Sequence, residues 1–395
     1  MNGRGLLIYH PLSFSFGGGF ERIFLQLAPR LVKTGFEVTI IATDYTGMDD
    51  PRIPSSLVRS YLADRSVKYI ELKSYPFLLG SPTRMPVIAP TARPILERAV
   101  KTCDVVYFDN AYALQDLAFI GLKFRYRKPV ISGHHSVLFH HTLHDLYVNL
   151  VSRNVIRFFD AIHVLNSDDA SVLSKWGAKN VHLIPLGVDT DRFTPSKSYG
   201  EGRTMKVALV GRLTEQKGID KFLLALAIIN SDPTARERTE FTVVGSGPLA
   251  PLVRAAALQH GNLRYVGPVD DDRLLEIYRD SDLIVMPSRQ ETMGIVALEA
   301  QACGLPVIAA RASGLSDIIM PDVTGTILRR NEADELASAI LFYLDLRFSD
   351  FARYVRMRTA ARENVQRRFS LEQTTRSLSR MIMNVADSGF ASDLT

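Results

Sequence analysis

Two carboxylates that stand eight positions apart, Glu291 and Glu299, are the residues of this chain best suited to do chemistry. The residues before them, 282–288, read as a short buried strand that ends in a turn, and Gly294 stands where a helix should begin. At about 1.5 Å per helical residue the two carboxylates could lie about 12 Å apart. That is too far for the carboxylate pair of a glycoside hydrolase, which needs about 5–9.5 Å.

A separation of this size suits the two ends of one elongated ligand. The backbone N–H groups of the helix's first turn, at Met293, Gly294 and Ile295, lie between the carboxylates and would attract an anion. The ligand would therefore carry hydroxyls at both ends and a phosphate in the middle. A nucleotide diphosphate sugar fits that description.

A glycine turn with two cations follows the first strand of the second half of the chain. Gly211 permits a tight turn, and Arg212 and Lys217 stand on the same short loop. A guanidinium and an ammonium together suit a diphosphate and would stabilise it as a leaving group, although alone they could be surface cations. A second glycine turn at Gly245 would lie on the same sheet edge, near the nucleotide.

The loop between the first strand and the first helix holds three glycines in Ser-Phe-Gly-Gly-Gly-Phe-Glu, and Gly18 and Gly19 give a ligand access to backbone. It is not Gly-x-Gly-x-x-Gly, because Arg22 occupies the third glycine's place. A nicotinamide-dependent oxidoreductase is therefore the weaker interpretation of this loop.

Five histidines cluster between positions 134 and 144. His134 and His135 directly follow a buried strand, which places at least one of them at the ligand-facing edge of the first sheet. His140, His141 and His144 have helical spacing, but only Asp145 is a nearby acid, so polar lining of a cleft is favoured over a metal site.

Apolar runs of strand length alternate with helical patterns along the chain, which predicts parallel sheets covered by helices. The pattern restarts after a polar, glycine-containing stretch at 196–204, so we expect two doubly wound domains with a cleft between them. The segment 76–94 is broken by prolines and is predicted to be a loop, whereas 350–380 is predicted to be helical.

Composition predicts a cytoplasmic protein. No apolar run approaches the roughly 18 residues that span a bilayer, the N-terminus lacks signal-peptide features, and Cys103 and Cys303 give no disulfide framework. No basic stripe with interleaved aromatics indicates nucleic acid. Residues 1–195 hold 22 basic and 17 acidic side chains and the remainder 25 of each, which is either scatter or a sign of peripheral contact with the inner membrane face.

The chain resembles glycosyltransferase family 4, the retaining transferases of the GT-B fold. The resemblance is strongest from Val207 to about Asp334. It includes Gly-Arg-Leu-x-x-x-Lys-Gly, Val-Gly-x-Gly-Pro, the Glu-x7-Glu pair and Ala-Cys-Gly-Leu-Pro in that order. The resemblance implies an acceptor-binding domain at 1–195, a nucleotide-sugar domain at 196–365 and a final helix, 366–395, that crosses back to the first domain.

The resemblance also implies the roles of matching residues. Arg212 and Lys217 would bind the donor diphosphate, Glu299 the ribose hydroxyls and Glu291 the transferred sugar. His135, or else His134, would lie beside the donor sugar, with no metal and no cofactor required. A hexose would pass from the nucleotide sugar to a glycan or lipid-linked acceptor with retention of configuration. The alternatives are a related epimerase or sugar synthase, the oxidoreductase, or a binding protein with a degenerate site.

Overall fold

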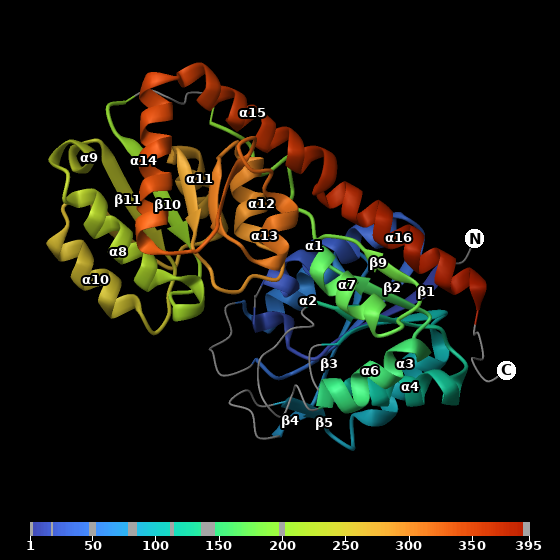
Figure 1. The fold of residues 1–395 in the computed structure, drawn as a ribbon. Helices are drawn as coiled ribbons and strands as arrows, with labels where there is room; N and C mark the ends of the chain where they lie inside the picture. Colours follow the sequence, from blue (N-terminus) through green and yellow to red (C-terminus); the bar gives the residue numbers. More distant parts are fainter. Residues whose placement is uncertain are drawn as a thin grey trace. The chain divides into compact units, whose positions relative to one another are not determined.

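The computed structural model describes residues 3–16, 19–46, 53–77, 85–110, 114–135, 147–196 and 202–389. It divides the chain into two compact units (Figure 1). The first unit comprises Met1–Pro185 together with Thr374–Thr395, and the second comprises Leu186–Gln373.

The first unit is built on a seven-stranded sheet in the order β3-β2-β1-β6-β7-β8-β9, with every neighbouring pair parallel. Because β2 and β3 lie on one side of β1 and β6 to β9 on the other, the strand order reverses between β1 and β6. The strands are β1 (Arg4–His10), β2 (Phe36–Thr43), β3 (Lys68–Leu72), β6 (Val105–Asp109), β7 (Val130–His134), β8 (Ala161–Val164) and β9 (Val181–Leu183).

Helices connect these strands, as the alternating pattern predicts. In α1 the side chains Ile23, Phe24, Leu27 and Leu31 form the buried stripe of an amphipathic helix. The helical segments of this unit are η1 (Phe14–Phe16), α1 (Gly19–Lys33), α2 (Ser55–Ala63), α3 (Arg93–Thr102), α4 (Gln115–Tyr126), η2 (Val148–Ser152), α6 (Arg153–Val155), η3 (Ile156–Phe158) and α7 (Ser167–Lys175).

The proline-containing segment 76–94 is not wholly irregular, so the prediction of a loop was wrong for its described parts. β4 (Ser74–Phe77) and β5 (Met85–Ile88) form an antiparallel pair in which Pro76 faces Pro86. A two-stranded ribbon tolerates proline because each strand has an edge whose N–H groups need no partner. Pro94 stands in the first turn of α3, where a missing N–H costs no hydrogen bond.

The second unit is built on a six-stranded sheet in the order β12-β11-β10-β13-β14-β15, again wholly parallel. Its strand order reverses between β10 and β13. The strands are β10 (Met205–Val210), β11 (Thr239–Val244), β12 (Leu263–Gly267), β13 (Leu283–Met286), β14 (Val307–Ala310) and β15 (Gly325–Leu328).

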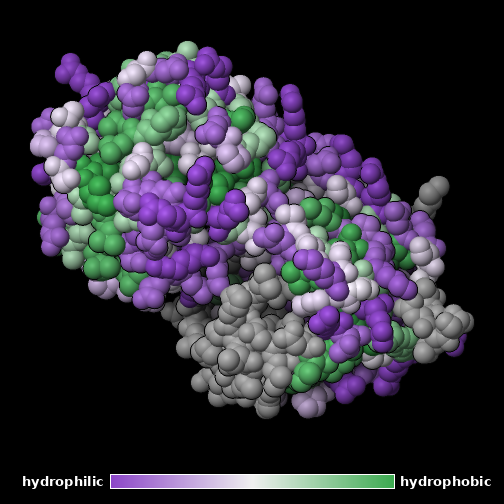
Figure 2. Space-filling model, viewed as in Figure 1, coloured by the Kyte–Doolittle hydropathy of each residue, from purple (hydrophilic) through white to green (hydrophobic). Residues whose placement is uncertain are grey.

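The second unit's buried core lies between this sheet and its helices and includes Phe222, Phe241, Leu283, Ile308 and Tyr343. Hydrophobic side chains also show on the surface over α8 and α10 (Figure 2), where Leu224 and Leu258 are exposed. The helical segments are η4 (Glu215–Lys217), α8 (Ile219–Asn230), α9 (Pro233–Glu237), α10 (Ala250–Gln259), α11 (Asp271–Asp280), α12 (Ile295–Ala302), α13 (Ser313–Ile318), α14 (Ala333–Ser349) and α15 (Phe351–Arg368).

The segment 350–380 is two helices, so the expectation of one helical stretch was wrong at its middle. α15 ends at Arg368 and α16 (Leu371–Ser388) begins three residues later. Between them Ser370 forms a bridge with Val188, whose N–H donates to the Phe369 carbonyl at 2.9 Å and whose carbonyl accepts from Leu371 N–H at 3.0 Å. The extended backbone that this bridge requires interrupts the helix.

Later in α16 the chain packs within the first unit. Ser379 Oγ donates to Thr34 Oγ1 at 3.1 Å, and Arg4 donates to the Met383 carbonyl at 3.3 Å.

Among the helices of the described ranges, none is both long and apolar enough to cross a membrane. The two doubly wound parallel domains predicted from the sequence are confirmed, whereas the domain limits and the cleft between the domains stay predictions.

Candidate functional site

The carboxyl ends of β10 and β11 carry two glycine turns that contact each other through backbone. Gly211 has φ +151° and Gly245 has φ +130°, and a Cβ atom on Gly245 would lie 1.9 Å from the Gly211 carbonyl oxygen. Tyr265 donates its hydroxyl to the Gly245 carbonyl at 3.0 Å and holds the second turn. The sequence predicts this juxtaposition, and it brings the turn with Arg212 to the point where the strand order reverses.

Lys217 and Glu291 lie in direct contact. The Lys217 Nζ atom is 2.5 Å from the Glu291 Oε2 atom, and both side chains are partly exposed. Lys217 ends the short η4 segment after β10, whereas Glu291 stands in the loop between β13 and α12. Residues 74 positions apart in the chain therefore form one polar site at the carboxyl edge of the sheet.

A third residue, Arg289, fastens the two loops that carry this pair. Its guanidinium forms two hydrogen bonds with the Asp220 carboxylate, at 3.0 and 2.6 Å, and a further one with the Glu215 carbonyl. Its backbone N–H donates to the Gln216 carbonyl at 2.7 Å. Arg289 was not predicted from the sequence, because a lone arginine in a loop usually faces solvent.

The helix α12 begins where the sequence predicts. Gly294 is its N-cap residue and adopts φ +77°, Met293 is buried, and Ile295 is the first helical residue. Gly314 of α13 packs on the preceding loop so closely that a Cβ atom there would lie 2.4 Å from Met293 Cα. The loop is thereby held against α13, and the first-turn N–H groups of α12 have a fixed direction.

Glu299 lies in α12 and is only 5% exposed. Its Oε2 atom accepts a hydrogen bond from the Tyr278 hydroxyl at 2.8 Å. A buried carboxylate held by a tyrosine presents a fixed acceptor, which is the property needed to orient a pair of hydroxyls.

Arg212 is exposed on the β10 turn, five positions before Lys217.

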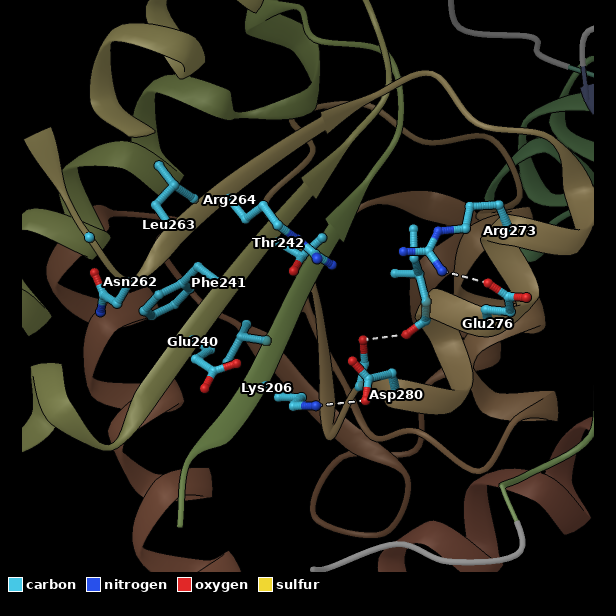
Figure 3. Close-up of a pocket in the computed structure, with 14 residues that line it drawn as sticks. Lys206, Glu240, Phe241, Thr242, Asn262, Leu263, Arg264, Arg273, Glu276 and Asp280 are labelled. Atoms are coloured by element: carbon cyan, nitrogen blue, oxygen red, sulfur yellow. Dashed lines mark hydrogen bonds and ion pairs between the residues drawn. The ribbon is translucent and has the colours of Figure 1, made fainter. Parts of the chain in front are cut away.

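A cavity of about 400 Å³ in the same unit does not include any of the predicted site residues (Figure 3). Strands β10 to β12 and helix α11 line it. Its charges are largely paired within the protein, since Lys206 contacts Asp280 at 2.6 Å and Arg273 contacts Glu276 at 2.5 Å (Figure 3). We place the candidate site at the carboxyl edge instead, where ligands bind in doubly wound sheets.

In the first unit a series of ionisable side chains, each in contact with the next, lies along the carboxyl edge of the sheet. Asp109 at the end of β6 lies between two histidines, with Oδ1 2.5 Å from His135 Nδ1 and Oδ2 2.9 Å from His10 Nδ1. The other ring nitrogen of His10 is 2.8 Å from a carboxylate oxygen of Glu21 in α1. The Tyr107 hydroxyl lies 3.2 Å from His135 Nε2.

This series of contacts continues from the Tyr107 side chain to the His163 side chain. The Tyr107 hydroxyl is 2.8 Å from His163 Nδ1, and His163 Nε2 is 2.7 Å from the Ile184 carbonyl oxygen. His134 lies apart from this series and contacts Asn110 at 3.3 Å. We call the series Glu21, His10, Asp109, His135, Tyr107 and His163 the histidine relay.

Electrostatics differ among these buried groups. Burial opposes a charge on His10, but Asp109 and Glu21 outweigh it and raise its pKa to about 9. Burial would likewise raise the pKa of Asp109, but His135 and His10 hold that pKa well below its usual range. Burial lowers the pKa of His134 to about 4 and that of His163 to about 3, so both rings are neutral at pH 7.

Of the other residues predicted for this edge, Gly19 begins α1 at the same edge, and Gly18 lies outside the described residues, as do His140, His141 and His144. Within the described ranges no three His, Cys, Asp or Glu side chains form a set that could hold a metal ion. His10, Glu21, Asp109 and His163 were missed. The available signal was that His10 and Asp109 each end an apolar run, at strand ends that adjacent parallel strands bring to one edge.

Family models match most of the chain. The model described as Glycosyltransferase Family 4 matches residues 17–192, and the model described as Glycosyl transferases group 1 matches residues 193–364. A D-inositol 3-phosphate glycosyltransferase of Geodermatophilus obscurus is 36% identical over 205 residues, which are 47% of this chain and 46% of that protein.

A GDP-mannose-dependent monoacylated alpha-(1-6)-phosphatidylinositol monomannoside mannosyltransferase of Corynebacterium glutamicum is 30% identical over 207 residues, 48% of this chain and 52% of that protein. The chain thus spans about half the length of the curated relatives it matches.

Solved structures resemble the whole chain. Anabaena HepE in complex with UDP has a TM-score of 0.74 at 17% identity and covers 96% of this chain and 100% of its own. Sucrose-phosphate synthase from Thermosynechococcus elongatus has a TM-score of 0.73 at 21% identity and covers 98% of this chain and 100% of its own. These likenesses establish the fold, which is the GT-B fold. The two family models, which together match residues 17–364, show that the chain belongs to glycosyltransferase family 4.

Proposed function

We propose that this protein transfers a hexose from a nucleotide diphosphate sugar to a hydroxyl of a glycan or lipid-linked acceptor, with retention of the anomeric configuration. The observation that carries the proposal is the contact between Lys217 and Glu291 at the carboxyl edge of the second sheet. It joins the cationic turn after β10 to the loop that leads into α12. The family membership and the names of the relatives, which include a GDP-mannose-dependent enzyme, support a nucleotide-sugar donor.

The donor's diphosphate would be bound by the cationic turn and by the first N–H groups of α12. Lys217 is paired with Glu291, and a diphosphate would offer it a stronger negative partner. Glu291 would then be released to accept hydrogen bonds from the hydroxyls of the sugar. Glu299, held by Tyr278, would accept hydrogen bonds from the ribose hydroxyls at the other end.

The transfer itself breaks the bond between the sugar's anomeric carbon and the phosphate oxygen. The acceptor oxygen attacks the same face of the sugar, and its proton passes to the departing phosphate oxygen. Arg212, Lys217 and the α12 N-terminus stabilise the charge that develops on the diphosphate, which is the largest electrostatic change in the reaction. Because these groups supply the positive potential, we propose that the reaction needs no metal ion.

The test begins with the donor. Thermal denaturation with a panel of UDP- and GDP-sugars should show a rise in Tm for one of them, because a ligand that binds only the folded state stabilises it. That donor should then release its nucleotide in an acceptor-dependent reaction that EDTA does not inhibit. NMR of the product should show the anomeric configuration of the donor.

Three results would each contradict a different part of this proposal. Inversion of the anomeric centre would refute retention, and loss of activity in EDTA that a divalent cation restores would refute metal independence. Absence of any nucleotide release would refute transfer itself. No observation on this chain favours an epimerase or a nicotinamide-dependent oxidoreductase.

A further inference from the structure

The directions of the hydrogen bonds in the histidine relay can be worked out from one end. The Ile184 carbonyl can only accept, so His163 must carry its proton on Nε2 and donate it. His163 is fully buried and neutral, so its Nδ1 atom is an acceptor. The Tyr107 hydroxyl must therefore donate its only proton to His163 Nδ1.

This direction decides the state of His135. The proton of Tyr107 is already used, so its oxygen can only accept from the His135 Nε2 atom, which lies 3.2 Å away. On the other side of the ring, the Asp109 carboxylate can only accept from His135 Nδ1. Both ring nitrogens must then carry protons, and the ring is an imidazolium cation.

The neighbours of His135 are consistent with a partly buried cation. Asp109 from β6 is the carboxylate in contact with it, while His10 from β1 is balanced by Asp109 and by Glu21 from α1. The ring of Phe20 lies 4.5 Å from both histidine rings, stacked on His10 and tilted against His135. An aromatic face beside a cation is favourable and also limits the access of water.

The nearby neutral groups are Tyr107 and His163, already placed, and His134. Asn110 has an N–H₂ donor within 3.3 Å of His134 Nε2, so that nitrogen accepts and His134 remains neutral. The described relay thus holds two carboxylates and two imidazolium rings in alternation. Its net charge is zero, which explains how so many ionisable groups can be buried together.

We propose that Asp109 on one side of the His135 ring and Tyr107, held by His163, on the other are positioning residues that keep His135 a permanent cation. His135 then serves the reaction as a fixed positive charge and not as a base. The inference rests on the proposed function for the role of His135 in transfer, but not for the state of its ring. A histidine whose two N–H groups are both used within the protein cannot take a proton from an acceptor hydroxyl. It can attract a phosphate group, either of the donor's diphosphate or of a phosphorylated acceptor.

The state of the ring can be tested without any substrate. In the full-length protein labelled with ¹⁵N-histidine, long-range ¹H–¹⁵N NMR distinguishes a doubly protonated ring from the two neutral tautomers. At pH 8 an ordinary histidine, with a pKa of about 6.5, is almost wholly neutral. We expect His135 and His10 to be doubly protonated at that pH and His134 and His163 to be neutral, and a neutral His135 would overturn the inference.

Two variants test the positioning residues. Asp109→Asn removes the charge that holds the proton, and Tyr107→Phe removes the acceptor at Nε2, so in either variant His135 should be neutral at pH 8. Tyr343→Phe is the matched control, because Tyr343 is a buried tyrosine with one hydroxyl partner, Thr326, in the other unit. Retention of the doubly protonated ring in both relay variants would overturn the role of Asp109 and Tyr107.

Turnover separates a positioning role from a structural one. With whichever UDP- or GDP-sugar of the panel the protein uses, Asp109→Asn should be at least tenfold slower at pH 8 and should recover at about pH 6, where an ordinary histidine is mostly protonated. A loss that does not change with pH would mean that Asp109 is merely structural and would overturn the proposal.

The two sources of phosphate can be separated in the same assay. If Asp109→Asn raises KM for the donor, the phosphate that His135 attracts belongs to the nucleotide sugar. If it raises KM for the acceptor, that phosphate belongs to the acceptor. If no UDP- or GDP-sugar of the panel is turned over, the proposed function fails and with it the role in transfer, whereas the ring states are still decided by NMR.

Discussion

Charged side chains lie at the carboxyl edges of both sheets, but they are partly exposed in the second unit and mostly buried in the first. In the second unit Lys217 and Glu291 are partly exposed, their side chains 30% and 16% accessible, and they stand on loops. In the first unit His10 and Asp109 are almost fully buried, and their partners are all within the protein. Charges of the first kind can change partner when a ligand arrives, whereas the fold itself fixes the protonation of the second kind.

The largest expected effect lies at the exposed edge. Lys217→Ala should lower turnover at least 1000-fold, about 4 kcal/mol of transition-state stabilisation, because the cation acts on the charge that develops on the leaving group. The melting temperature should change little, since the ion pair with Glu291 is solvent-accessible. Nucleotide release and thermal denaturation measure the two effects.

Lys221→Ala is the control for this variant. Lys221 stands on the neighbouring helix α8 and also contacts an acid, Glu332, at 2.8 Å. Its loss should leave turnover within about twofold of the wild type. Near-normal turnover in Lys217→Ala, or an equal loss in both variants, would remove Lys217 from the donor site.

The second prediction concerns the backbone on which the exposed edge is built. Gly245→Ala should lower the free energy of unfolding by about 3 kcal/mol or more, because φ is +130° and the new Cβ would meet the Gly211 carbonyl oxygen at 1.9 Å. Urea denaturation measures the loss. Gly177→Ala is the matched control, since Gly177 has φ +79° with no atom within 4 Å of its Cβ position. It should lose only about 1 kcal/mol, and equal losses would mean that the close contact of the two turns is absent.

The third prediction concerns the buried edge and its response to pH. The pKa of His10 is raised to about 9 in the folded protein, against about 6.5 for an unfolded histidine. The stabilisation from this ring is therefore complete below pH 6.5 and is lost as the pH rises to 9, about 3 kcal/mol in all. His134 and His163, with lowered pKa values, act in the opposite direction and lose their contribution as the pH falls below 6.5.

The free energy of unfolding from urea titrations should accordingly be largest near pH 6.5. In His10→Asn the decline between pH 6.5 and 9 should become shallower by up to about 1.4 kcal/mol per pH unit, which is the contribution of one proton. An unchanged slope would show that His10 is neutral in the folded protein.

The sequence predicted the buried central strands of both sheets better than the partly exposed strands at their edges. The central strands β1, β6, β10 and β13 are nearly continuous apolar runs and were predicted, because a strand buried on both faces can contain little else. The edge strands β3, β9 and β15 were missed. At least half of the residues in each of these strands are not fully buried, so their composition is less apolar than that of a central strand.

The candidate site divides likewise. Residues of the second unit that a short motif brings together, such as Gly211 with Lys217 and Gly294 with Glu299, could be predicted because local spacing places them. The histidine relay could not, since it joins residues of α1 and of the strands β1, β6 and β8 with His135, which directly follows β7. Its members come together only through strand order and register, which periodicity along the chain does not reveal.

The smallest expected effect tests whether the ion pair between Arg289 and Asp220 is needed to hold the carboxyl edge of the second sheet in place. Arg289→Ala should lower the free energy of unfolding by less than about 1 kcal/mol, because Arg289 and Asp220 are 39% and 40% exposed. It should nonetheless lower kcat/KM about tenfold, because loss of the guanidinium's hydrogen bonds to Asp220 and to the Glu215 carbonyl would loosen the loop with Glu291 against the turn with Lys217. The exchanged pair, Arg289→Asp with Asp220→Arg, should recover part of that loss, because it restores an ion pair between the loop with Glu291 and the first turn of α8. If the exchanged pair is no better than Arg289→Ala, or if Arg289→Ala is fully active, the loops hold their positions without this ion pair. The exposed edge would then be as rigidly built as the buried one.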